Sequence, residues 1–223
     1  MTYGEPLDGL LLERVITQID AAPRSEVTAI LAALSGESRV RLLRALRTME
    51  SELGAPGDQS PPFILRSQRS GDMGWVVRSH GLLYHAEYGW GGRFEALVAE
   101  VVAHFIRNFD AERERCWIAE RHGENVGSVF LIGHPERAGV AKLRMLLVDP
   151  KARGLGIGRR LVGECTTFAR QVGYRTITLW TNSMLHVARK IYEEEGYRLV
   201  AEEPHDSFGH NLIGQTWELD LGR

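Results

Sequence analysis

The fold is decided by a stretch that reads Leu146-Leu147-Val148-Asp149-Pro150-Lys151-Ala152-Arg153-Gly154-Leu155-Gly156-Ile157-Gly158-Arg159. Its pattern predicts a buried strand, a turn and a glycine-rich entry into a helix. The glycines at 154, 156 and 158 keep side chains away, so that loop N–H groups and the positive helix N-terminus can point at one anion. Arg153 and Arg159 can add charge-assisted hydrogen bonds to phosphate oxygens. The stretch therefore predicts a loop that binds phosphate groups.

The spacing of these glycines excludes two common nucleotide loops. A dinucleotide fingerprint requires G-x-G-x-x-G with an acidic residue about 20 positions later. A P-loop requires Lys followed by Ser or Thr after its last glycine, whereas Gly158 is followed by Arg159 and Arg160.

The remaining pattern, R-x-x-G-x-G from Arg153 to Gly158, resembles the pyrophosphate-binding motif of the GNAT N-acetyltransferase superfamily. The cofactor of that superfamily is acetyl-coenzyme A (acetyl-CoA). The resemblance extends over roughly residues 63 to 222, and it implies that backbone groups of the preceding strand pair with the pantetheine amides. It implies cofactor contacts by Leu146, Leu147, Val148, Arg153, Gly154, Leu155, Gly156, Ile157, Gly158, Arg159, Asn182, Arg189 and Tyr192.

A second segment, Trp180 to Tyr197, predicts a strand that leads into an amphipathic helix. Asn182 or Ser183 is the expected N-cap, and Gly196 is expected to end the helix. The segment resembles the other cofactor element of the superfamily, N-x-x-A-x-x-x-Y-x-x-x-G-[FY], although its alanine lies at 188. By that resemblance, the Tyr192 hydroxyl faces the coenzyme sulfur and acts as a general acid.

Composition and charge favour an enzyme of the cytoplasm. The 223 residues are 43% hydrophobic and 25% charged, enough for one core and a small appendage. A net charge of −2 does not indicate the excess of basic residues that is typical of nucleic-acid-binding proteins. We expect no membrane span, no secretion signal and no metal site, and we expect Cys116 and Cys165 to be free thiols.

The helical periodicity of residues 7–53 predicts an N-terminal arm of three helices, broken at 20–23 and at Ser35-Gly36. Residues 54–62 have linker composition, so we expect an all-α arm over 1–58 and a catalytic domain over 59–223. The arm resembles the dimerisation helices of MarR-type regulators without their winged helix. That resemblance implies a homodimer that does not bind DNA directly, and a helical hairpin packed on its own catalytic domain is the alternative.

The catalytic domain is predicted to have the α/β fold of the superfamily, in which helices cover both faces of a mixed sheet. Strands are expected at 63–69, 115–121, 125–133, 139–149, 175–181, 197–204 and 211–220. Helices are expected at 72–87, 93–109, 156–172 and 184–195, with a hairpin turn at His122-Gly123.

Acetyl transfer to an amine requires a proton acceptor for the amine, a donor to the developing oxyanion and an acid for the thiolate. The Leu147 N–H is the candidate oxyanion donor. Many relatives place a glutamate in the strand where this chain has Ala141 to Met145, which contains no carboxylate. The candidate bases are therefore Glu87, His134 and His210.

By the same resemblance, the stretch from His80 to Trp90 lies where the superfamily has its substrate-gating loops, between the first two helices of the domain. Tyr84, Glu87, Tyr88 and Trp90 would make an aromatic, acidic site for a cationic amine. A loop fixed by buried aromatic side chains is the alternative.

Together these features predict an acetyl-CoA-dependent N-acetyltransferase that acts on a small-molecule or protein amine. Two alternatives remain open. One is a regulatory protein that senses acetyl-CoA and acts through a partner. The other is an acyltransferase that uses a hydroxyl acceptor or a larger acyl-CoA.

Overall fold

The computed structural model describes residues 63–222 and, before them, residues 32–36, 38, 41–42 and 45. The chain divides into two units, residues 1–58 and 59–223. Within the first unit, the Ser35 hydroxyl accepts a hydrogen bond from the backbone N–H of Ser38 at 3.1 Å, as the cap of a helix start does. Most of the predicted N-terminal arm, and with it the MarR-like interpretation, lies outside the described residues.

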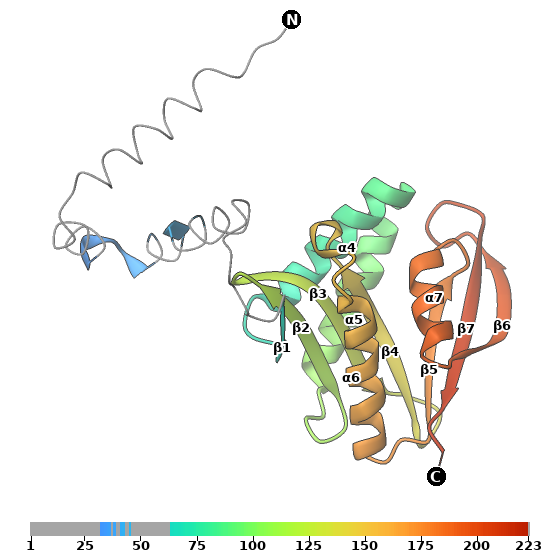
Figure 1. The fold of residues 1–223 in the computed structure, drawn as a ribbon. Coiled ribbons are helices and arrows are strands. Elements are labelled where there is room, and N and C mark those ends of the chain that lie inside the picture. The colour runs from blue at the N-terminus through green and yellow to red at the C-terminus, as the bar shows by residue number, and fades with distance from the viewer. Residues whose placement is uncertain (1–31, 37, 39–40, 43–44, 46–62, 223) are drawn as a thin grey trace, which may run out of the picture. The chain divides into compact units, whose positions relative to one another are not determined.

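The second unit is built on a sheet of seven strands with the order β1-β2-β3-β4-β5-β7-β6 (Figure 1). The pairing is antiparallel throughout except between β4 and β5, which are parallel. The strands are β1 (Ile64–Ser67), β2 (Arg115–Arg121), β3 (Glu124–Gly133), β4 (Val140–Val148), β5 (Thr176–Asn182), β6 (Arg198–His205) and β7 (Leu212–Asp220).

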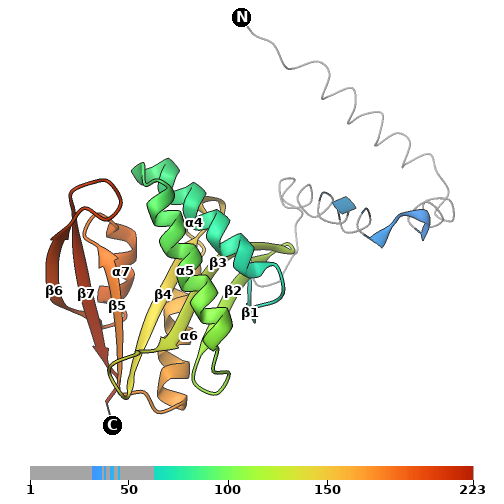
Figure 2. The ribbon, with the colours of Figure 1, turned by 180° about the vertical axis from the view of Figure 1, so that it is seen from behind.

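Helices cover both faces of this sheet, as the sequence predicted. Figure 1 shows α6 and α7 in front of the sheet, and Figure 2 shows α4 and α5 on the opposite face. Their bounds are α4 (Asp72–Tyr88), α5 (Gly92–Asn108), α6 (Ile157–Gln171) and α7 (His186–Glu194), and a short 3-10 turn, η1, covers Pro150–Ala152. The mixed α/β fold is therefore confirmed.

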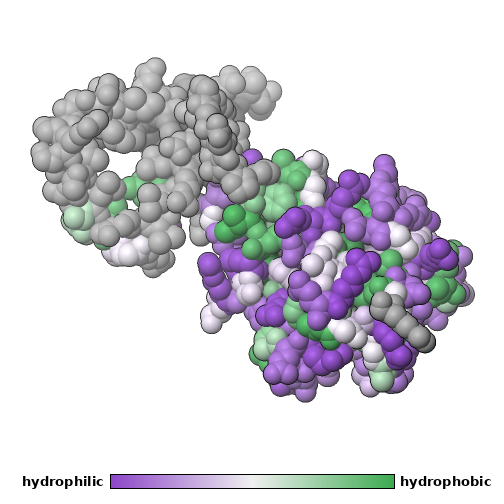
Figure 3. Space-filling model, turned by 60° about the horizontal axis from the view of Figure 1, so that its bottom comes forward, coloured by the Kyte–Doolittle hydropathy of each residue, from purple (hydrophilic) through white to green (hydrophobic). Residues whose placement is uncertain are grey.

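The central strand β3 is buried on both faces because its side chains alternate between two cores. Val129 and Leu131 pack with the α6 side, whereas Phe130 and Ile132 pack with the α4–α5 side. On the surface, hydrophobic side chains appear as separate patches among hydrophilic ones on the face shown in Figure 3. No helix of the described residues is long and apolar enough to cross a membrane.

The feature that positions the site is a split in the middle of the sheet. β4 pairs with β5 only from Val140 to Leu143, after which β4 stays with β3 and β5 stays with β7. The split begins at a bulge, where Met145 has a φ of 53° and its carbonyl accepts a hydrogen bond from the Ser128 hydroxyl at 2.9 Å. The backbone that follows, residues 146–148, is therefore released from β5.

Two local predictions are resolved here. The hairpin turn at His122-Gly123 is confirmed, with φ values of 51° and 79° that suit a tight turn between antiparallel strands. The predicted N-cap of the last helix was wrong, because Asn182 is still paired with Gly214 as the end of β5, and α7 is capped by Leu185. Strand pairing between distant segments thus overrides the local capping preference.

Candidate active site

Two cavities meet at the split between β4 and β5. The first, which we call the loop cavity, has a volume of about 500 Å³ and is lined by residues 146–148, by residues of the 152–159 loop, and by side chains of α4 and α7. The second, which we call the aromatic cavity, has a volume of about 210 Å³ and lies on the α4–α5 side. Four residues line both cavities: Tyr84, Leu146, Leu185 and Ala188. A ligand in the loop cavity can therefore reach a ligand in the aromatic cavity.

The loop cavity is shaped by two glycines in the left-handed backbone region. Gly154 and Gly156 have φ values of 83° and 77°, and a Cβ built on either would meet nothing within 4 Å. Gly156 is also the N-cap of α6, so the N–H groups of the first turn of that helix open toward the cavity. The loop is therefore an open cradle with a positive helix end, which suits a diphosphate.

The third glycine of the motif has a different task. A Cβ on Gly158 would lie 2.8 Å from Cδ1 of Ile191, so Gly158 allows α6 to approach α7 closely. A glycine is therefore required at 158 for the packing of α6 against α7.

The two arginines of the motif each have an acidic partner. Arg153 pairs with Glu87 of α4 at 2.6 Å, and Arg159 pairs with Glu194 of α7. The side chains of Arg153 and Arg159 are 46% and 61% exposed, so both guanidinium groups can exchange a carboxylate for a phosphate.

Four predicted cofactor contacts do not line the loop cavity. Arg189 donates a hydrogen bond to the Ser183 carbonyl at 2.9 Å, lies over the ring of Trp217, and lines neither cavity. Leu155 packs against the α6-side core. Asn182 and Tyr192 line the aromatic cavity instead of the loop cavity. Their contacts with the coenzyme stay predictions.

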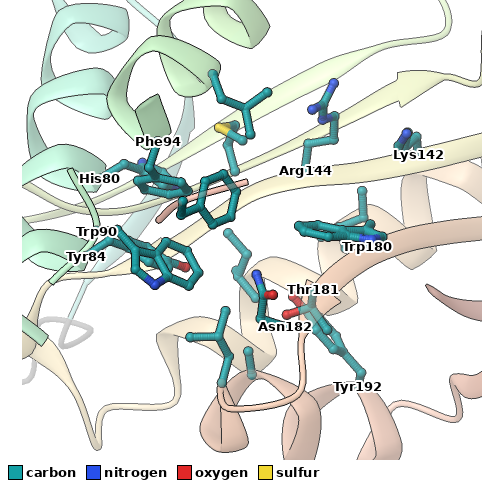
Figure 4. Close-up of a pocket in the computed structure, with 17 residues that line it drawn as sticks. His80, Tyr84, Trp90, Phe94, Lys142, Arg144, Trp180, Thr181, Asn182 and Tyr192 are labelled. Atoms are coloured by element: carbon teal, nitrogen blue, oxygen red, sulfur yellow. The ribbon is translucent and has the colours of Figure 1, made fainter. Parts of the chain in front are cut away.

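The aromatic cavity is walled by a cluster of stacked rings (Figure 4). Tyr84 lies 5.0 Å from Trp90 and 4.6 Å from Phe94 between ring centroids, and Phe208 lies 4.6 Å from Trp90. Trp180 of β5 closes another side. Close ring packing fixes this wall before any ligand enters.

Tyr192 of α7 reaches the same cavity. Figure 4 shows its ring directed from α7 toward Asn182 and Thr181, and the residue is only 4% exposed. Burial raises the pKa of the Tyr192 phenol above its ordinary value, so the hydroxyl keeps its proton at neutral pH. A protonated phenol in the aromatic cavity can donate a proton to a leaving group.

His80 is a cavity residue to which sequence reasoning assigned no individual role, although it begins the predicted substrate stretch. Its Nδ1 donates a hydrogen bond to the Val76 carbonyl at 2.9 Å, and burial lowers the pKa of its imidazole to about 4. The ring is therefore neutral, and it stacks on Tyr84 at a centroid distance of 5.9 Å. Only its place on the aromatic face of a continuous α4, at four-residue spacing from Tyr84, could have indicated this role.

The predicted acidic substrate loop is not formed. Residues 80–88 belong to α4, and the connection to α5 is only Gly89–Gly91. Tyr84 and Trp90 line the aromatic cavity, whereas Glu87 and Tyr88 line the loop cavity. No carboxylate lines the aromatic cavity within the part of the chain that the structure describes. The Glu87 carboxylate lies on the loop-cavity side, where it pairs with Arg153.

The other two predicted bases, unlike Glu87, lie outside both cavities. His134 follows the end of β3 and accepts a hydrogen bond at Nδ1 from the Glu136 N–H at 3.2 Å. His210 is exposed beside Gly89, whose carbonyl lies 3.5 Å from its Nε2. Neither imidazole lines the loop cavity or the aromatic cavity.

Two cations take the place of the expected carboxylate. Lys142 and Arg144 lie two residues apart on β4, and both line the aromatic cavity. Burial lowers the pKa of each side chain, and the charge of Arg144 lowers that of Lys142 further. Figure 4 shows both side chains on the far side of the cavity from the aromatic wall.

Comparison with known proteins finds one family. A profile described as the acetyltransferase (GNAT) family matches residues 83–197. N-acetylaspartate synthetase of Xenopus tropicalis is 34% identical over 103 residues, which are 46% of this chain and 36% of that protein. Mycothiol acetyltransferase of Thermomonospora curvata is 27% identical over 199 residues, 84% of this chain and 61% of that protein.

The alignment with the Thermomonospora curvata protein covers more of the chain than residues 59–223 alone could supply, so it extends into the first unit. This chain spans only about a third of the length of the N-acetylaspartate synthetases that it matches.

Solved structures share the fold. The YncA acetyltransferase structure from Salmonella typhimurium, which contains acetyl-CoA, has a TM-score of 0.59 at 18% identity and covers 73% of this chain and 95% of its own. Ribosomal-protein-alanine N-acetyltransferase from Brucella melitensis has a TM-score of 0.59 at 20% identity, over 70% and 99% of the two chains.

Proposed function

Since this chain belongs to the acetyltransferase (GNAT) family, we propose that it transfers the acetyl group of acetyl-CoA to a primary amine. The observation that carries the proposal is the meeting of the two cavities at Tyr84, Leu146, Leu185 and Ala188, with the Tyr192 phenol at the aromatic side. The loop cavity takes the coenzyme and the aromatic cavity takes the acceptor.

The residues of the loop cavity fit a coenzyme A diphosphate. The open Cβ positions of Gly154 and Gly156 leave room for phosphate oxygens, and the first turn of α6 supplies N–H donors. Arg153 and Arg159 supply charge once they release Glu87 and Glu194. The strand segment 146–148, which β5 leaves unpaired, offers backbone groups for the pantetheine amides.

Acetyl-CoA, when bound, supplies an acetyl group activated as a thioester. In the transfer, a bond forms between the amine nitrogen and the carbonyl carbon, the carbon–sulfur bond breaks, and one proton leaves the amine. Tyr192 would give its proton to the departing sulfur and regain one from water, which receives the proton that the amine loses. The Leu147 N–H would donate to the carbonyl oxygen as negative charge develops there.

Proton removal from the amine does not require a strong base in this cavity. Lys142 and Arg144 place positive charge around the acceptor, which lowers the pKa of a bound ammonium and favours its neutral form. His80 is a poor base, because a pKa of about 4 lies far from neutral pH. Water that enters with the amine can therefore carry the proton away.

A coenzyme-release assay over a panel of amines, with the mass shift of each product, tests the proposal. We expect free thiol to appear only with an amine present, and a product heavier by one acetyl group. Acetyl-CoA that fails to bind, or thiol release without an acetylated product, would contradict it.

Two relatives indicate the kind of amine to try first. N-acetylaspartate synthetase is named for an amino acid that carries the acetyl group on nitrogen, and mycothiol acetyltransferase is named for a thiol compound. Both names favour a small molecule over a protein as the acceptor.

We also infer that residues 1–58 join two copies of the chain, in line with their MarR-like pattern of apolar positions. Three short amphipathic helices bury little core among themselves, so their apolar stripes require a second surface. Light scattering should give a mass near twice 25.0 kDa. A monomer would leave packing against the catalytic domain as the alternative.

A further inference from the structure

The aromatic cavity contains two cations and no acid. Lys142 and Arg144 line it, and no Asp or Glu is among its lining residues within the described part of the chain. Over the same residues, neither side chain takes part in an ion pair. Glu136, on the connection before β4, lies outside the cavity. Its charge raises the pKa of Lys142 by less than the charge of Arg144 lowers it.

The strand geometry places both charges on one face. Successive side chains of a strand alternate, so Lys142 and Arg144 share a side while Leu143 packs into the α6-side core. Two residues along a strand are separated by about 7 Å. The two cationic groups therefore face the same cavity at a distance that an acidic small molecule can bridge.

Partly buried, unpaired charges are costly, and proteins keep them where an opposite charge completes the site. Here each cation loses hydration, and the two repel each other. An anion between them would relieve both costs. A second ammonium on the ligand, as in a polyamine, would add to the repulsion.

A polar donor stands beside the cations. Asn182 is 2% exposed and lines the aromatic cavity, and its Oδ1 accepts a hydrogen bond from Nε2 of His205 at 2.7 Å. That bond fixes the amide so that its nitrogen remains as a donor. Figure 4 shows Asn182 extending into the cavity between Tyr192 and the aromatic wall.

We propose that the acceptor is a small amine that carries a carboxylate, and that Lys142 and Arg144 bind this carboxylate while the aromatic wall encloses the rest. The inference rests on the proposed acetyl transfer and names the acceptor of the same site. The cavity volume of about 210 Å³ suits an amino acid better than a protein segment. The charge of the site is opposite to that of the cationic-amine site predicted from the sequence.

The first arm of the test compares amines that differ in charge but little in size. Aspartate is compared with its diamide, alanine with alaninamide, and spermidine serves as the polycation, with rates corrected for the neutral fraction of each amine. We expect kcat/KM to be about 10- to 100-fold higher for the carboxylate member of each pair and lowest for spermidine. O-phosphoethanolamine is included, because a clear preference for it would replace the carboxylate by a phosphate and overturn the proposal.

The second arm changes the cations. Lys142→Met and Arg144→Met should each raise KM for aspartate about 10- to 100-fold, while the Kd of acetyl-CoA stays within about twofold. Lys142→Arg should restore most of the loss. Arg198→Met removes an exposed arginine of β6 that lines neither cavity, and it is the matched control that should leave KM unchanged.

The outcomes separate the two proposals. If acetyl-CoA binds and alaninamide or spermidine is acetylated as well as aspartate, the carboxylate inference fails and acetyl transfer stands. If acetyl-CoA does not bind, the proposed function itself fails. If acetyl-CoA binds and no amine of the panel reacts, calorimetry with aspartate on the coenzyme-bound protein decides, and binding no tighter than that of alaninamide overturns the inference.

Discussion

Replacing Gly156 by aspartate, and comparing this variant with Gly156→Asn, tests whether the loop proposed for the coenzyme binds a negatively charged group. Gly156 is the N-cap of α6, has a φ of 77°, and leaves open space where a Cβ would lie. An aspartate there places a carboxylate at the mouth of the cradle proposed for the diphosphate. Asparagine has nearly the same size and tolerates the left-handed backbone, so Gly156→Asn is the matched control.

The size of the effect follows from charge and exposure. Two like charges about 5 Å apart interact by about 3 kcal/mol at an effective dielectric constant of about 20. Gly156 is exposed, so water and salt reduce this to about 1 to 2.5 kcal/mol. Coenzyme A should therefore bind about 5- to 70-fold more weakly to Gly156→Asp than to Gly156→Asn.

The stability of the fold should move little. A left-handed aspartate costs about 1 to 2 kcal/mol, but a carboxylate at an N-cap recovers about 0.5 to 1 kcal/mol through the N–H groups and dipole of the helix. Calorimetry with coenzyme A at low and high salt, together with urea unfolding, measures both quantities. Equal affinities of the Asp and Asn variants at low salt would refute phosphate binding by this loop.

Three further predictions follow from the site and its support. Tyr192→Phe should lower kcat about 100-fold or more while the Kd of acetyl-CoA stays within about twofold, because the proton is needed only as the thiolate leaves; single-turnover kinetics would expose an unchanged chemical step. Glu87→Gln should tighten coenzyme A binding by less than about fivefold in calorimetry, because it releases Arg153 from its 2.6 Å ion pair; weaker binding would exclude competition between Glu87 and phosphate. Asp72→Asn should lower the free energy of unfolding at pH 7 by about 2 to 4 kcal/mol, because Arg66 at 2.7 Å loses a buried partner. Burial alone would raise the pKa of Asp72, but hydrogen bonds from Arg66, Asn125 and the Arg69 N–H hold it below its ordinary value. Protonation of Asp72 therefore removes this stabilisation from the wild-type protein, and the difference in unfolding free energy between wild type and Asp72→Asn should shrink in urea titrations as pH falls below about 5.

Features that depend on neighbouring residues could be predicted from the sequence. The glycine loop and the His122-Gly123 turn depend on backbone freedom that only a few residue types supply. The order of strands and helices followed from periodicity in the same way, because each element repeats its pattern over several turns or pleats. Local rules therefore predicted the fold and the geometry of the glycine loop.

Features that depend on distant partners could not be predicted. Glu87 is separated by 66 positions from Arg153, and nothing near Glu87 in sequence indicates that ion pair. Arg189 lies on the helix of the cofactor motif, yet its guanidinium is held by the Ser183 carbonyl and the Trp217 ring. The absence of a carboxylate between Ala141 and Met145 was visible in the sequence. The sequence did not show that Lys142 of this segment lines a cavity.

The two cavities differ in how the chain assembles them, and this has an evolutionary consequence. The loop cavity takes most of its lining from one continuous segment, 146–159, whereas the aromatic cavity gathers side chains from α4, α5, β4, β5, α7 and the connection before β7. Selection can therefore exchange single residues of the aromatic cavity one at a time without changing the 146–159 segment. With the coenzyme in the loop cavity and the amine in the aromatic cavity, as proposed, a few point substitutions would suffice to change the acceptor. Lys142 and Arg144 are the positions where we expect such substitutions first.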